Sequence, residues 1–351
     1  MSIARTIALA FVVSAAFLRT LDLSAGEPMV ESGSLDLVWR KIAQGPFNPR
    51  DGAGLVFFNK KLWLLGGWQN SVPEHDGIAD YNDVWNSPNG TEWTFVNRAQ
   101  WGGPPPWGGR HCAGSVVFRN RIWVISGDGH PDVWSSRDGK TWEQAAAHAP
   151  WGQRYAPYVT VFRDKIWLMG GISFWDVHGE FTLLDAPLSF NDVWCSSDGV
   201  RWELVLDHAP WSPRGLIHGS VVFKGRCWIM GGGIKGRDTL AEYNDVWNTA
   251  DGVHWNEVTS SAPWAPRTHA NIIVFNRRIW TFGGSVGHQT SLSNEVWSSP
   301  DGRNWKAAGG VPWSPTHATS LVVFRNRLLM VAGYLRNDIW EMAPDGTNHL
   351  P

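Results

Sequence analysis

The chain has 351 residues, of which 43% are hydrophobic and 18% charged, and its formal net charge is −2. This balance is typical of a soluble globular protein, and it gives no electrostatic reason to expect nucleic acid or an anionic membrane as a partner. The 38 glycines and 21 prolines suit many short strands joined by turns, whereas the 25 tryptophans are unusual.

The N-terminus has the features of a secretory signal peptide. Arg5 supplies a positive charge, the apolar stretch 6–18 is too short to span a bilayer comfortably, and small residues follow at 24–26. We therefore expect a signal peptide at 1–26, a linker at 27–34 and one domain at 35–351. The mature protein would be secreted or periplasmic, with no membrane span after cleavage. An uncleaved N-terminal anchor is the alternative.

From residue 50 onward the chain repeats a pattern of four short strands, called a to d. In the second repeat, strand a runs from Arg110 to Phe118, strand b ends at Gly127, strand c ends at Trp134 and strand d opens with Trp142. Asp-Gly at 138–139 predicts a two-residue turn between strands c and d, because glycine adopts a positive φ without penalty. The other repeats follow the same plan.

The last repeat lacks a counterpart of strand d. Its strand c ends at Trp340, while residues 38–42, with Trp39, match the strand d sequence 92–96 of the first repeat. Six repeats of four strands each are the signature of a β-propeller. We therefore expect an all-β, six-bladed propeller of four-stranded antiparallel blades, in which the N-terminal strand closes the last blade.

Three repeated features resemble Kelch repeats: glycine pairs such as Gly66-Gly67 after strand b, an arginine opening strand a, and tryptophan in strand d. The resemblance covers residues 35–345 and extends to the propeller superfamily that includes the central domain of galactose oxidase. Tryptophan in strand c, where Kelch repeats often carry tyrosine, is a departure. The turn at 136–142 also resembles the Asp-box of sialidase-type propellers, which is structural in those enzymes.

Most of the tryptophans and all of the cysteines have structural explanations. An aromatic side chain at the same place in each blade fills the space between stacked sheets, and 22 of the 25 tryptophans follow this rule. Cys112, Cys195 and Cys227 lie in three different repeats with no C-x-x-C spacing, which favours buried free thiols. One disulfide with a leftover thiol is the alternative.

The long connections, b–c and d–a, should lie on one face, together with the start of each strand a. Five arginines occupy these starts and are candidate ligands for carboxylate or phosphate groups. The arginines are Arg50, Arg110, Arg154, Arg214 and Arg267. The alternative is that they pair with the acidic residues that precede the strand c tryptophans. In Kelch adaptor proteins, arginines at this place bind acidic peptides.

Two long b–c loops flank a short one and predict a notch above the second blade. The first loop contributes Trp68 and His75, and the short loop contributes His130. The third repeat's loop contributes Trp175, Asp176, His178 and Glu180. A concave site of this kind suits a sugar or a peptide, although solvated loops are the simpler explanation. His111 and His317 occupy equivalent places, but their repeats are not neighbours, so we expect no metal site.

The leading functional interpretation is a secreted or periplasmic Kelch-like scaffold that binds a glycan or a protein through the face of the long loops, without a cofactor. A glycan, a sugar acid or an acidic peptide would suit this face. Whether the protein is an enzyme stays open. Six-bladed Kelch-like propellers include a periplasmic sialic acid mutarotase, although no motif in this sequence singles that enzyme out. The Kelch resemblance therefore implies an alternative, a cofactor-independent sugar-acid mutarotase or epimerase, in which Arg110, Arg154, His178 and Glu180 would act. A copper oxidase is a distant third, since the crosslinked Tyr and Cys of galactose oxidase have no match.

Overall fold

The computed structural model describes residues 37–69, 79–97, 107–173, 188–216, 219, 221–235 and 240–344. These residues form strands and turns, with no α-helix among them. Nowhere in these ranges is there a helix long and apolar enough to cross a membrane. The all-β prediction is therefore confirmed for the part of the chain that the structure describes.

The strands pair into four-stranded antiparallel sheets, and the strand order follows the chain. The first sheet contains β2 (Gly54–Phe58), β3 (Lys61–Gln69), β4 (Ala79–Ser87) and β5 (Thr94–Asn97). The second contains β6 (Gly114–Phe118), β7 (Arg121–Ile125), β8 (Val133–Ser136) and β9 (Glu143–Ala146). The third contains β10 (Tyr158–Phe162), β11 (Lys165–Ser173), β12 (Leu188–Ser196) and β13 (Glu203–Leu206).

The remaining large sheets follow the same order, with an interruption in the middle of each of the next two. One contains β14 (Val221–Phe223), β15 (Arg226–Met230), β18 (Val246–Thr249) and β19 (Trp255–Thr259). The next contains β21 (Asn271–Phe275), β22 (Arg278–Phe282), β25 (Val296–Ser299) and β26 (Lys306–Ala307). The last contains β27 (Ser320–Phe324), β28 (Arg327–Gly333), β29 (Arg336–Pro344) and β1 (Leu37–Gln44).

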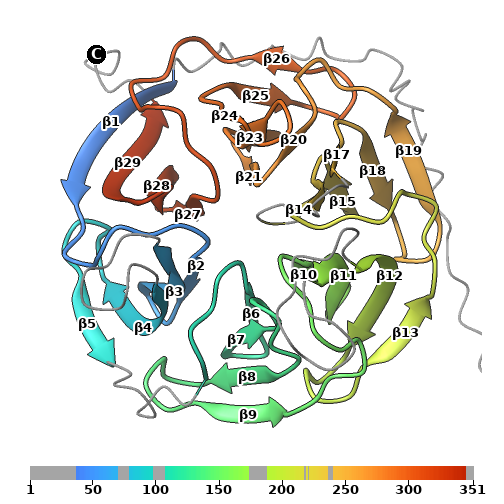
Figure 1. Cartoon of the computed structure of the whole chain (residues 1–351). Coiled ribbons are helices and arrows are strands. Elements are labelled where there is room, and N and C mark those ends of the chain that lie inside the picture. Colours follow the sequence, from blue (N-terminus) through green and yellow to red (C-terminus); the bar gives the residue numbers. More distant parts are fainter. Residues whose placement is uncertain are drawn as a thin grey trace, which may run out of the picture. The chain divides into compact units, whose positions relative to one another are not determined.

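The sheets are arranged around a central axis in a propeller-like manner (Figure 1). The first strand of each sheet is innermost, and β2 contacts both β6 and β27. The segment around Trp39 lies where the repeat predicts, since β1 pairs antiparallel with β29 and Trp39 stands opposite Met342. Residues from the two ends of the chain thus share one sheet.

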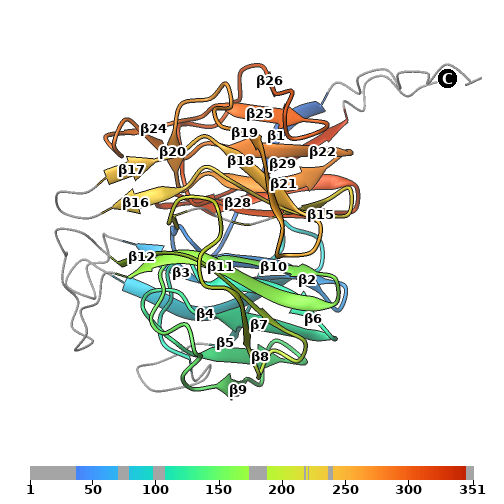
Figure 2. The ribbon, with the colours of Figure 1, turned by 90° about the vertical axis from the view of Figure 1, so that its right-hand side faces the viewer.

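Two small sheets lie on the side of the long connections. They are a ribbon of β16 (Gly233–Lys235) and β17 (Leu240–Glu242), and a sheet of β20 (Arg267–Thr268), β23 (Ser285–Val286) and β24 (Ser291–Leu292). Figure 2 shows β16, β17, β20 and β24 on the left-hand face of the molecule. The short hairpin turns that join the first two strands of each large sheet end on the opposite face.

Tryptophans of the second strands form the contact between neighbouring sheets. The indole N–H of Trp63 donates to the Phe58 carbonyl at 2.9 Å, which holds the ring at the edge of its sheet. A Cβ on Gly139, in the turn of the next sheet, would lie 2.2 Å from that ring. Gly199, Gly252 and Gly302 stand in the same relation to Trp123, Trp167 and Trp228. Glycine is therefore required at the turn because the tryptophan lies against it.

The turn between the third and fourth strands differs from the prediction. β8 ends at Ser136 and β9 begins at Glu143, so the connection is longer than a two-residue hairpin turn. Asp138 accepts hydrogen bonds from the backbone N–H groups of Lys140 (2.8 Å) and Thr141 (2.7 Å), which stabilise this wider loop. The predicted positive φ of Gly139 is confirmed at 73°.

The three cysteines are buried and form no disulfide, as expected. Burial raises the pKa of Cys227 to about 12, because water no longer stabilises the thiolate, and a hydrogen bond from the Trp228 backbone N–H offsets only part of this effect. This thiol is therefore unreactive at neutral pH.

Candidate functional site

The repeated arginines at the start of each first strand are buried structural groups. Arg154 is 2% exposed and donates to the Gly170 carbonyl at 2.8 Å and to both carboxylate oxygens of Asp192, at 2.8 and 2.7 Å. The Phe190 ring lies under its guanidinium at 3.5 Å. The arginine thus joins Gly170 of the second strand, β11, to Asp192 of the third strand, β12.

The alternative expectation, that each repeated arginine pairs with the acidic residue before the strand c tryptophan, is correct in all five repeats that have the arginine. The pairs are Arg50–Asp83, Arg110–Asp132, Arg154–Asp192, Arg214–Asp245 and Arg267–Glu295. Each arginine is at most 2% exposed, so its guanidinium does not face an open channel. Ligand binding by these arginines stays a prediction, and the site described below does not use them.

A kink in the backbone follows each of these starts. The second residue after the arginine, or after Thr316 in the last repeat, has a positive φ in every repeat. These residues are Gly52, Cys112, Ala156, Leu216, His269 and Ala318. Several of them are joined around the axis, since Cys112 N–H donates to Gly52 O and Gly52 N–H donates to Ala318 O, both at 2.9 Å. The kinks set the direction of the side chains that precede them.

Four of the side chains just before these kinks, together with Ser285, form a continuous cluster that spans five repeats. His111 Nδ1 lies 2.9 Å from the Tyr155 hydroxyl, and His111 Nε2 lies 2.9 Å from Asp51 Oδ1. Asp51 Oδ2 lies 3.0 Å from His317 Nε2, and His317 Nδ1 lies 2.7 Å from the Ser285 hydroxyl. We call Asp51, His111 and His317 the His–Asp–His cluster.

Charge is concentrated at this cluster. The Asp51 side chain is fully buried, while those of His111 and His317 are 14% and 17% exposed. Burial by itself would raise the pKa of Asp51, but the two imidazoles outweigh it and hold that pKa below its usual range. Burial likewise opposes protonation of His111, yet the neighbouring Cys112 sulfur and Asp51 carboxylate raise its pKa well above the ordinary value.

The polar atoms of the cluster contact one another rather than solvent, through hydrogen bonds and, between His111 Nε2 and Asp51 Oδ1, through an ion pair. Both ring nitrogens of His111 and both of His317 lie within 3.0 Å of a protein oxygen. Neither imidazole presents a nitrogen to a ligand without breaking one of these contacts, and acid–base work needs such a nitrogen. The geometry therefore favours a positioning and charge-holding role.

Sequence reasoning identified the histidines of this cluster but not their connection. His111 and His317 come from repeats that are not neighbours, and Asp51 from the repeat between them joins the two rings. β2, which follows Asp51, contacts the strands after both histidines. Reading the residue after each repeated arginine, in ring order rather than in chain order, would have found the set.

Trp68 covers one side of the cluster. Its backbone exchanges hydrogen bonds with Asp51, N–H to O at 2.9 and 3.0 Å. Its indole stacks on the His111 ring, with centroids 5.3 Å apart and planes inclined by 14°. The side chain is partly exposed at the end of β3. It is therefore a rigid aromatic surface at the face of the long connections.

Carboxylates and a histidine lie beside Trp68. Asp80 stands at the surface opposite Trp68 across the β3–β4 pair, with its carboxyl group turned towards Asp128. Reduced solvation of this carboxyl group, the charge of Asp128 and a hydrogen bond between the two side chains raise the pKa of Asp80 to about 7. Burial and the nearby Arg110 charge lower the pKa of His130, which is partly exposed. We call Trp68, Asp80, Asp128 and His130 the Trp68 site.

The predicted notch is therefore described in part. Trp68 and His130 come together through Asp80 and Asp128, two residues that sequence reasoning missed. Asp80 and Asp128 gave little indication of a site in the sequence, because single aspartates in loops are common. The other predicted members lie outside the described residues, namely His75, Trp175, Asp176, His178 and Glu180.

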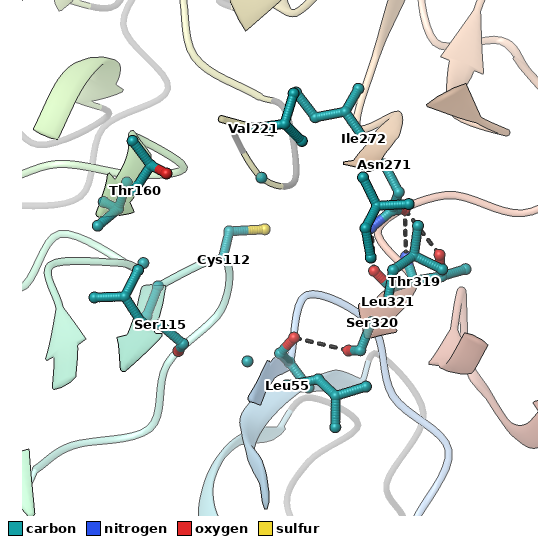
Figure 3. Close-up of a pocket in the computed structure, with 18 of the residues that line it drawn as sticks. Leu55, Cys112, Ser115, Thr160, Val221, Asn271, Ile272, Thr319, Ser320 and Leu321 are labelled. Atoms are coloured by element: carbon teal, nitrogen blue, oxygen red, sulfur yellow. Dashed lines mark hydrogen bonds between the residues drawn. The ribbon is translucent and has the colours of Figure 1, made fainter. Parts of the chain in front are cut away.

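A hollow lies on the axis between the innermost strands. It encloses about 260 Å³, and its wall includes Cys112, Ser115, Asn271 and Thr319 (Figure 3). Part of its polar surface holds neighbouring repeats together, since Asn271 Oδ1 accepts from both the backbone N–H and the hydroxyl of Thr319 at 2.9 Å.

Metal ligands do not gather in the described part of the chain. No group of three or more His, Cys, Asp or Glu residues there could hold a metal ion.

Beside the His–Asp–His cluster, the Cys112 sulfur lies 3.5 Å from the Tyr155 hydroxyl oxygen.

The cluster makes a specific prediction about stability and pH. The contribution of His111 is complete below pH 6.5, its ordinary pKa, and is lost as the pH rises through its raised pKa. The contribution of Asp51 is complete above pH 3.8 and is lost as the pH falls through its lowered pKa. Melting temperatures of the wild type and Asp51→Asn should therefore differ most between these values and converge at alkaline pH. Asp164→Asn, at an exposed turn, serves as the control, and a pH-independent difference for Asp51→Asn would contradict the pairing.

Comparison with known proteins assigns neither a family nor a function to the chain. No protein-family model matches the chain, and none of the curated proteins has a significantly similar sequence.

Proposed function

We propose that this chain is an exported six-bladed propeller of the Kelch type that binds a glycan at the Trp68 site. The sixfold sequence repeat, the four-stranded sheets around one axis and the pairing of β1 with β29 support closure of the last blade by the N-terminal strand. The signal-like N-terminus supports export to the periplasm or the medium.

The observation that carries the binding role is the fixed indole of Trp68 beside carboxylates. An aromatic face packs on the C–H face of a sugar ring, and carboxylates accept hydrogen bonds from hydroxyl groups. Backbone contacts with Asp51 and stacking on His111 hold the indole in place before a ligand arrives. Such preorganisation reduces the entropy lost on binding.

The charges at the site favour a neutral or basic glycan over a sugar acid or an acidic peptide. The repeated arginines that would hold a carboxylate are buried against their own acidic partners. The groups beside Trp68 are instead the carboxylates of Asp80 and Asp128. An anionic ligand would meet repulsion there.

A second candidate is cofactor-independent mutarotation or epimerisation of a sugar. The pKa of Asp80, about 7, and its hydrogen bond with Asp128 favour this candidate, because two carboxylates that share a proton can donate and accept near neutral pH. Faster exchange of sugar anomers, followed by NMR in the presence of the protein, would support it.

The binding proposal is tested by a glycan screen of the mature protein, followed by titration of the best hit. Trp68→Ala should weaken binding at least tenfold, since stacking contributes about 1.5 kcal/mol. Asp80→Asn should weaken it several-fold, with the melting temperature unchanged.

Asp164→Asn, an equivalent change on the other face, is the matched control and should bind like the wild type. Wild-type affinity in both Trp68→Ala and Asp80→Asn would rule out this site. Stronger binding of sugar acids than of neutral glycans would instead overturn the assignment of ligand class.

A further inference from the structure

The face opposite the Trp68 site is built from short hairpin loops of one kind. In each large sheet a two-residue loop joins the first strand to the second, as between Phe118 and Arg121. Both loop residues have φ between 47° and 70° in every case. Turns of this type require a positive φ at both positions and therefore favour Asn, Asp or Gly.

Every loop has one residue that suits the turn and one that does not. Asn59, Asn120, Asp164, Gly225, Asn276 and Asn326 suit it. The other position is a lysine or an arginine, and all six are exposed: Lys60, Arg119, Arg163, Lys224, Arg277 and Arg325. Long side chains occupy the left-handed conformation at a cost, so turn geometry does not explain the choice of these residues.

Aromatic rings hold four of these cations in place. The last residue of the first strand is phenylalanine, and the cation that follows it lies above the ring. The four charges lie 4.7 to 5.6 Å from the ring centres, for Arg119, Arg163, Lys224 and Arg325. Cation–π contact restrains the flexible side chains, so the positive charges form a fixed ring.

Within the six loops little negative charge offsets this ring. Asp164 is the one acidic residue there, and it lies 3.1 Å from Arg119. The residue after each loop is also basic, although Arg121, Lys165 and Arg327 pair with glutamates of their own sheets. Among the described residues, Lys60, Lys224 and Arg277 pair with no carboxylate.

The turns between the third and fourth strands lie on the same face, since Asn59 donates to the Arg137 carbonyl and Arg325 to the Pro88 carbonyl. These turns add four aspartates, each of which accepts backbone N–H bonds of its own turn: Asp138, Asp198, Asp251 and Asp301. The loops and the residues that follow them still carry twelve basic residues against one acidic residue, although the net charge of the whole chain is −2.

Exposed apolar side chains accompany the cations on this face. Phe57, Val222 and Val323 are 45%, 39% and 39% exposed, and each stands one residue before the phenylalanine that ends its strand. Exposed apolar groups close to cations match the interface of an anionic bilayer, where apolar groups enter the headgroup region and cations contact phosphates.

We propose that this face docks onto the surface of an anionic phospholipid membrane and leaves the Trp68 site pointing away from it. A soluble polyanion would use the cations but not the exposed apolar side chains. The proposal is independent of the ligand that the opposite face binds.

The test is co-sedimentation of the mature protein with phosphatidylcholine vesicles that contain or lack phosphatidylglycerol. Binding is expected with the anionic vesicles alone and should weaken as salt is added. A sixfold variant removes the ring: Lys60→Gly, Arg119→Asn, Arg163→Asn, Lys224→Asn, Arg277→Gly and Arg325→Asn. It should lose detectable binding, while its melting temperature stays equal or rises, because each substitution places a turn-favouring residue in the loop.

A matched pair of double variants separates the ring from overall charge. Lys224→Asn with Arg277→Gly should weaken partitioning roughly 25-fold, since each cation at an anionic surface contributes about fivefold. Lys41→Gln with Arg336→Gln removes the same charge away from the loops, in the middle of the outer strand β1 and at the opposite end of β29, and should change partitioning little. Equal losses in the two pairs, equal binding to neutral vesicles, or binding to soluble polyphosphate but not to vesicles would each overturn the proposal.

Discussion

Replacing Arg154 with Met should lower the free energy of unfolding by about 3–5 kcal/mol, because it leaves a buried carboxylate without its partner. Asp192 is buried and accepts two hydrogen bonds from this guanidinium. The Gly170 carbonyl loses its side-chain donor as well. Chemical denaturation followed by tryptophan fluorescence measures the change.

The control for this effect is Arg303→Met, which alters an exposed arginine of a turn and should cost less than about 0.5 kcal/mol. A double variant, Arg154→Met with Asp192→Leu, should recover part of the loss, because it removes the uncompensated charge. If Arg154→Met were no more harmful than Arg303→Met, the arginine would not be the structural link described above. Its guanidinium would then be available for a ligand.

Gly139→Ala should destabilise the protein by about 2–4 kcal/mol, because it combines backbone strain with overpacking. The new Cβ would lie 2.2 Å from the Trp63 ring, which is buried between two sheets. Trp63 is held by its hydrogen bond to Phe58, so it can move aside only by giving up that contact. Thermal unfolding should show the loss directly.

Gly152→Ala is a close match for this variant. Its φ is 74°, against 73° for Gly139, but nothing lies within 4 Å of the added Cβ. It should therefore report the backbone strain alone, about 1 kcal/mol. Equal effects of the two substitutions would show that the tryptophan yields and that this contact does not join the sheets.

Arg154→Met and Gly139→Ala test the two repeated contacts that hold the strands and sheets together. The arginine joins strands within one sheet, and the tryptophan–glycine contact joins one sheet to the next. Both occur once per repeat with few exceptions. In the last repeat Leu329 replaces the tryptophan, and Gly90 of the first sheet lies against it, so a smaller side chain fills the same place.

The sequence by itself determined the local structure of each repeat, that is, its strands and its turns. Turn residues, the repeated glycines and the spacing of tryptophans predict four short antiparallel strands, and the match of residues 38–42 to strand d predicts the pairing of β1 with β29. Each of these features depends on contacts that recur in every copy. The pairing of the repeated arginines with acids was foreseen for the same reason, as one of two alternatives.

The tertiary structure decided where single residues from different repeats meet. Asp51 joins His111 to His317 because the chain returns on itself and places the first sheet between the second and the last, which linear spacing does not show. The basic loop face was hidden in the same way, since an overall charge carries no direction. Position around the axis, rather than residue type, determines which groups act together in this protein.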